Sequence, residues 1–209
     1  MSKKFIISGA IVLAAVAGVA VYLYTQRPSA QAAAAQQPAF SFDSSHTTDW
    51  WSNGNSNPRD DIDPSTYDES LNGPIDSLPV SDLRVHHGGP GHATPADNCF
   101  VSASYYDHRL DDVAAAYSEY RQPTDKWGGT REQLGEISRT ITTPEGEKSY
   151  QLLRYHFIQP GGSQEYLSGY QIGFANLAHG HLRIESVCKT PADLDLTLPI
   201  LDRIQLHER

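Results

Sequence analysis

The chain has 209 residues, of which 39% are hydrophobic, 10% aromatic and 20% charged. It is long enough for one ordinary domain and is neither wholly disordered nor fibrous. Sixteen Lys and Arg face 25 Asp and Glu, which gives a formal net charge of −9. Such a surface repels the phosphates of nucleic acid, so we expect no nucleic acid partner.

The N-terminus carries a long apolar run. Lys3 and Lys4 precede residues 5–24, a run of 20 residues without a charge. A helix of that length, with a rise of about 1.5 Å per residue, spans a hydrocarbon core of about 30 Å. We therefore expect a cytoplasmic tip at residues 1–4 and a transmembrane anchor at residues 5–24, oriented by the paired lysines.

A cleaved signal peptide is the alternative for the same segment. Ala30-Gln31-Ala32 offers a small-residue cleavage pattern, although the apolar part of a signal peptide usually has only about 7–15 residues. Both interpretations place residues 25 onward on the extracytoplasmic side of the membrane. We expect a single-pass protein of the cell membrane with an extracytoplasmic C-terminal part, or a secreted protein if cleavage occurs.

Residues 25–98 have the composition of a tether. They hold eight of the 13 prolines, and ten acidic residues face three basic ones. Few β-branched residues and a high net charge leave little apolar surface to offset the entropy of ordering, so we expect a Pro/Ala-rich, acidic and largely disordered linker. Trp50 and Trp51 interrupt it. Because exposed tryptophan is usually avoided, we favour their folding back onto the domain; a docking motif for a partner is the alternative.

Residues 99–209 have the patterns of a folded domain. Residues 99–105 alternate as a strand does, and apolar residues at helical spacing between Leu110 and Tyr117 predict a helix. Four further extended stretches follow, two of which form a hairpin around Pro144. The sequence from Thr190 to Asp193 is typical of a helix start.

This order of elements, β-α-β-β-β-β-α, predicts a single small α+β domain. We expect an antiparallel four- to five-stranded sheet with two packed helices, preceded by a transmembrane helix and a long linker. The order resembles that of PsbP-like domains, in which a helix follows the opening strand and another closes the chain. The resemblance covers Cys99 to Leu206 and implies an α/β/α sandwich, but a fold does not imply a function.

Cys99 and Cys188 lie at matching positions on the apolar faces of two predicted strands. An extracytoplasmic compartment is oxidising, so we expect the pair to form a disulfide. Two separate buried thiols are the alternative. Nothing in the sequence resembles the Cys-x-x-Cys motif of redox-active pairs.

Three of the nine histidines, His86, His87 and His92, gather in a glycine-rich stretch. Glycines let such a loop fold back, so the imidazoles could converge on zinc, copper or nickel. The spacing matches no established ligand pattern, and a solvated polar loop is the alternative. The motifs of nucleophilic hydrolases, zinc proteases and nucleotide-binding loops are absent, so we expect neither an enzyme nor a cofactor.

Tyrosine is frequent, with 11 residues. Most should pack between sheet and helix; an aromatic binding face for peptide or glycan is the sharper alternative. We therefore expect a membrane-anchored extracytoplasmic module that binds an envelope protein or glycan without catalysis. The alternative is an extracytoplasmic metal-binding protein or metal-dependent enzyme that uses the loop of His86, His87 and His92.

Overall fold

The computed structural model describes residues 38–45, 47, 49–63, 66–72, 74–88, 99–160 and 167–208. They belong to one compact unit, Pro38–Arg209. The expected cytoplasmic tip, the expected anchor at residues 5–24 and the first part of the expected tether lie outside the described residues. Within the ranges that the structure describes, no helix has the length and apolarity needed to cross a membrane.

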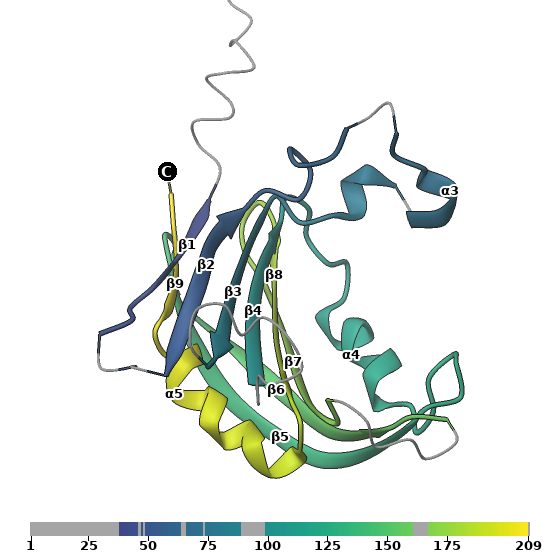
Figure 1. Ribbon diagram of the computed structural model, residues 1–209. Coiled ribbons are helices and arrows are strands. Elements are labelled where there is room, and N and C mark those ends of the chain that lie inside the picture. The colour runs from purple at the N-terminus through teal and green to yellow at the C-terminus, as the bar shows by residue number, and fades with distance from the viewer. Residues whose placement is uncertain are drawn as a thin grey trace, which may run out of the picture. The chain divides into compact units, whose positions relative to one another are not determined.

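In the part of the chain that the structure describes, nine strands form one sheet that curls almost into a barrel (Figure 1). The strands are β1 Ala39–Phe42, β2 Trp50–Ser56, β3 Ser81–His87, β4 Cys99–Tyr106, β5 Thr130–Thr143, β6 Gly146–Ile158, β7 Gly169–Asn176, β8 His181–Cys188 and β9 Ile204–His207. Their order across the sheet is β1-β9-β5-β6-β7-β8-β4-β3-β2. Neighbours run antiparallel, except that β5 and β9 meet in parallel at Thr142 and Gln205.

This architecture corrects the expected fold class. The predicted antiparallel sheet of four to five strands with two packed helices is wrong, because the sheet is mixed and has nine strands. The α/β/α sandwich implied by the PsbP-like order of elements is not formed either. The helical segments of the described residues are short: α3 Glu69–Asn72, η1 Ile75–Ser77, α4 Val113–Arg121, η2 Pro191–Thr197 and α5 Leu198–Leu201.

Three strands of the sheet, β1, β2 and β3, come from residues 25–98, the segment expected to be a tether. β3 pairs with β4 along most of its length, and β1 pairs with β9. Their apolar residues are buried: Phe40 is 3% exposed, Leu83 1% and Val85 0%. The folded unit therefore begins at Pro38 and not at Cys99, because backbone pairing and a few buried side chains order a segment of unfavourable average composition.

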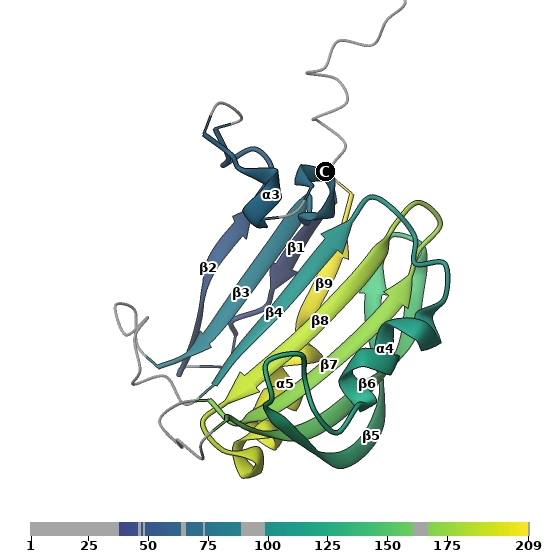
Figure 2. The ribbon, with the colours of Figure 1, turned by 90° about the vertical axis from the view of Figure 1, so that its right-hand side faces the viewer.

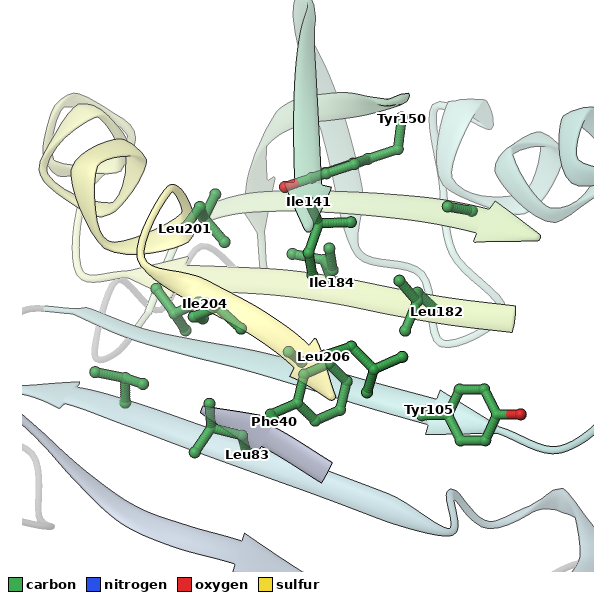
Figure 3. Packing of buried hydrophobic residues seen from close by; sticks show 14 of the residues in the cluster. Phe40, Leu83, Tyr105, Ile141, Tyr150, Leu182, Ile184, Leu201, Ile204 and Leu206 are labelled. Atoms are coloured by element: carbon green, nitrogen blue, oxygen red, sulfur yellow. The ribbon is translucent and has the colours of Figure 1, made fainter. Parts of the chain in front are cut away.

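The main hydrophobic core fills the inner face of the curled sheet (Figure 3). Its buried members include Phe40, Leu83, Val85, Val101, Ala103, Tyr105, Ile141, Tyr150, Leu152, Leu182, Ile184, Ile200, Leu201, Ile204 and Leu206. Because successive side chains of a strand point to opposite faces, the residues between these core positions lie on the outer face.

One side chain joins the two edge strands. The Asn55 Oδ1 on β2 accepts a hydrogen bond from the backbone N–H of Phe40 on β1 at 2.8 Å. Its Nδ2 donates to the Phe40 carbonyl. β1 and β2 stand at opposite ends of the strand order, so the Asn55 amide supplies the link that a backbone ladder supplies elsewhere.

Helix α4 packs on the outer face of the sheet. Figure 2 looks onto this face and shows α4 crossing β7 and β6. Tyr117 of α4 is 4% exposed and packs with Leu153, Ile172 and Phe174. Its Oη donates to the Gln151 carbonyl at 2.6 Å and accepts from the Phe174 N–H at 2.9 Å. The helix therefore covers the part of the outer face that β6 and β7 form (Figure 2).

Candidate functional site

Cys99 and Cys188 form the expected disulfide. They lie directly opposite each other in the register of β4 and β8, and both are fully buried at 0% exposure. Leu194 of η2 and the half-buried Trp50 pack against them. The prediction of a disulfide is confirmed, and the bond is part of the interior.

Trp50 and Trp51 are consecutive residues of β2, so their side chains point to opposite faces of the sheet. Trp50 lies inward, opposite His87, and contacts the core and the disulfide. Trp51 lies outward, opposite His86. The pair is therefore part of the sheet and is divided between its two faces; a docking role remains a prediction.

The same alternation divides the histidines of the predicted metal loop. His87 lies beside Trp50, with 5.0 Å between ring centroids, and His86 lies on the outer face beside Trp51. His92 lies outside the described residues. The structure thus separates His86 from His87, and the residues that it describes hold no group of three or more His, Cys, Asp or Glu suited to a metal ion.

A row of mostly aromatic side chains crosses the outer face. The strand register places six residues side by side on β2, β3, β4, β8, β7 and β6. We call them the outer aromatic row: Trp51, His86, Phe100, Val187, Tyr170 and Tyr155. The row runs across the strands, so it joins residues that are far apart in the sequence.

The rings of the outer aromatic row contact one another. Trp51 and His86 stack with 4.9 Å between centroids and 21° between planes, and His86 lies 6.3 Å from Phe100. Tyr155 and Tyr170 stack at 5.4 Å and 7°. Trp51, His86, Phe100 and Tyr170 are half-buried, which leaves part of each ring accessible, whereas Val187 and Tyr155 are buried.

A second row, polar in character, runs beside the first. The register aligns Arg84, Ser102 and Glu185 on β3, β4 and β8, each two residues from a member of the outer aromatic row. We call these three the polar row. Glu185 pairs with Arg183 at 2.9 Å, and Arg84 pairs with Asp82 at 3.2 Å. The charges beside the rings are therefore held in place and balanced.

Further contacts fix this polar region. Ser104 donates a hydrogen bond to Asp82 at 2.7 Å. Burial raises the pKa of the Tyr106 phenol, and the opposing effect of Arg183 is smaller. Tyr106 is therefore a neutral hydroxyl near neutral pH, able both to donate and to accept.

The end of the outer aromatic row on β6 is fixed by Arg131. This guanidinium is 5.7 Å from the Tyr120 ring and 5.8 Å from the Tyr155 ring, and it donates to the Glu119 carbonyl at 2.9 Å. Burial raises the pKa of the Tyr155 phenol well above its ordinary value. Arg131 thus ties the row to the C-terminal end of α4.

A tight turn next to this end exposes a tryptophan that sequence reasoning missed. Trp127 is 73% exposed, with Lys126 Nζ 4.4 Å from its ring centroid. Asp125 Oδ1 accepts from the Trp127 N–H at 2.9 Å and from the Gly129 N–H at 2.7 Å. Gly129 lies so close to Phe157 that an added Cβ would come within 2.3 Å of that ring. In the sequence, the Asp-x-Trp-x-Gly spacing was the pattern that could have indicated this turn and its exposed tryptophan.

The tyrosines are divided between packing and surface. Tyr105 and Tyr150 belong to the inner core. Tyr117, Tyr120, Tyr155 and Tyr170 belong to the cluster between α4 and the sheet. These six tyrosines thus pack as expected, and Tyr170 is the half-buried tyrosine of the outer aromatic row, beside Trp51, His86 and Phe100.

No protein-family model matches this chain, and no curated protein is significantly similar to it in sequence.

Proposed function

We propose that this protein is a membrane-anchored, extracytoplasmic module that binds a ligand on the outer aromatic row without catalysis. The observation that carries the proposal is the row itself. Trp51, His86, Phe100 and Tyr170 keep part of their ring surface accessible on the side of the sheet opposite the main core. Aromatic rings that are partly exposed and adjacent to one another are typical of binding surfaces.

Rigidity supports the same proposal. The outer aromatic row and the polar row stand on paired strands, and their side chains are held by stacking and ion pairs. A ligand therefore meets groups whose conformational entropy has already been lost on folding, which favours binding. The carboxylates beside the rings are paired with arginines, an arrangement suited to recognition through hydrogen bonds.

The proposed location rests on two features. The uncharged run at residues 5–24 is long enough to anchor the chain, and its N-terminal lysines favour a cytoplasmic tip. The buried Cys99–Cys188 disulfide is typical of proteins that fold outside the cytoplasm.

The test is co-sedimentation of the full chain with washed, insoluble envelope from the cells that produce it. Trp51→Ala should weaken binding about tenfold, as expected for a central aromatic contact. Leu196→Ala is the matched control, because Leu196 is an apolar side chain 48% exposed on η2, outside the row. Envelope binding that Trp51→Ala leaves unchanged would contradict the proposal.

A further inference from the structure

We infer that the ligand of the outer aromatic row is a neutral oligosaccharide, whose sugar rings stack on the aromatic side chains while its hydroxyls bond to the polar row. This inference rests on the proposed function and names the class of ligand.

The direction of the row favours a linear ligand that crosses the strands. Neighbouring strands lie about 4.8 Å apart, so the four steps from Trp51 on β2 to Tyr170 on β7, the last half-buried ring of the row, span about 19 Å. An extended peptide that adds to a sheet edge lies parallel to the strands and uses backbone hydrogen bonds. A ligand that contacts Trp51, His86 and Phe100 in succession instead runs at a right angle to them.

The chemistry of the rings fits a sugar. One face of a sugar ring is a patch of C–H groups, and an aromatic face carries negative charge that attracts such groups. The Trp51 and His86 rings stack with 21° between their planes, so each covers one face of the other, and a sugar can stack only on the ring faces that this pair leaves free.

The polar row supplies what the hydroxyls of the same sugar need. It lies two residues along each strand from the rings, a separation of about 7 Å. A sugar hydroxyl both donates and accepts hydrogen bonds; in the polar row Glu185 offers an acceptor, Arg84 a donor and the Ser102 hydroxyl both.

The charge of the protein disfavours an anionic ligand. Each carboxylate beside the rings is paired with an arginine, Glu185 with Arg183 and Asp82 with Arg84. The patch itself is therefore close to neutral, and the net charge of −9 repels polyanions such as sulfated glycans.

The hydrogen-bond donors of the row also disfavour a proline-rich peptide. Such peptides dock in aromatic grooves, where indole and phenol groups donate to their carbonyls. The Trp51 indole nitrogen is buried within the protein and Tyr155 is 5% exposed. In the polar row beside the rings, acceptors accompany donors.

The experiment titrates the full chain, held in a zwitterionic detergent without sugar groups, with cellohexaose, chitohexaose and mannohexaose. Binding is measured by calorimetry at low and at high salt. We expect at least one of the three to bind with an affinity that salt does not change. Trp51→Ala and Glu185→Gln should each weaken binding about tenfold, and Leu196→Ala should not.

Two outcomes would overturn the inference. One is that none of the three neutral sugars binds, while a proline-rich peptide or a sulfated oligosaccharide does so through Trp51; the proposed function would then stand with another ligand. The other is neutral sugar binding that neither Trp51→Ala nor Glu185→Gln affects. Trp51→Phe is the control for misfolding of Trp51→Ala. It keeps an aromatic ring at this position, so it should retain most of the affinity.

Discussion

The indole of Trp51 lies over the imidazole of His86, with 4.9 Å between centroids, on the outer face of the sheet. The preceding residue, Trp50, lies on the inner face against the disulfide. Two adjacent tryptophans thus lie in separate environments, and the contribution of each can be tested alone.

Trp50→Ala should destabilise the protein much more than Trp51→Ala. Trp50 packs against both the main core and the disulfide cluster, so its removal leaves a cavity and should lower the free energy of unfolding by about 2–4 kcal/mol. Trp51→Ala removes a half-buried outer ring and should cost about 1 kcal/mol or less. Urea unfolding followed by circular dichroism measures both; a larger loss for Trp51→Ala would show that the faces are wrongly assigned.

Removal of the disulfide should have one of the largest effects on stability. The bond joins residues 89 apart in the sequence, and the chain-entropy model assigns such a loop about 4–5 kcal/mol. The double variant Cys99→Ser/Cys188→Ser should lower the free energy of unfolding by several kcal/mol. Since both cysteines are 0% exposed, dithiothreitol should reduce the bond only in urea-unfolded protein. Equally fast reduction of the folded protein would contradict the buried position.

Asn55→Ala should loosen the junction between β1 and β2. The exposed Asn55 side chain both accepts from and donates to the backbone of Phe40, and a hydrogen bond of this kind contributes about 0.5–1.5 kcal/mol. Hydrogen exchange at the Phe40 amide should accelerate. Ser56→Ala, at an exposed position on the same strand, is the control and should leave that amide protected; an unchanged rate in Asn55→Ala would contradict the junction.

Stability should fall as the pH falls below about 7, partly because of His181. Burial lowers the pKa of His181, an effect that exceeds the opposing hydrogen bond to the His108 carbonyl, while the nearby His108 and Arg183 side chains lower it further. The unfolded chain therefore binds a proton near pH 6.5 that the folded chain binds only at lower pH. The stabilisation is complete above the unfolded pKa and is lost as the pH decreases toward the folded pKa.

His181→Asn should reduce this pH dependence between about pH 7 and 5.5, because an asparagine can still donate to the His108 carbonyl but does not titrate. The measurement is the unfolding free energy at both pH values. His179→Asn, at an exposed position of the same turn, is the control. An equal slope in wild type and His181→Asn would show that other groups cause the dependence.

Part of the fold could be predicted from the sequence. The hairpin of β5 and β6 contains a recognisable turn, and the core positions 101, 103 and 105 of β4 and 182 and 184 of β8 recur every second residue, which a sequence displays directly. The disulfide was predictable because only two cysteines exist and both fall on apolar strand faces. β2 could not be found in this way, since Trp50–Ser56 contains mostly polar residues and its order comes from pairing with β3. β9 alternates over only four residues.

The candidate site was even less accessible to sequence reasoning. Its members come from six strands between Trp51 and Val187, and what unites them is the register of neighbouring strands. Tyrosine content indicated an aromatic surface, but it could not separate the buried Tyr105 and Tyr150 from the outer Tyr170. The separation of His86 from His87 likewise follows from strand alternation once β3 is known.

The most direct test of the central claim uses fluorine NMR on the full chain labelled with 5-fluorotryptophan. The chain has three tryptophans, Trp50, Trp51 and Trp127, so three resonances are expected and can be assigned with single Trp→Phe variants. On addition of solubilised envelope polymer from the producing cells, we expect the Trp51 resonance to shift or broaden while that of the inner Trp50 changes little. A Trp51 resonance that stays in place while the polymer demonstrably binds would contradict the assignment of the outer aromatic row as the binding site.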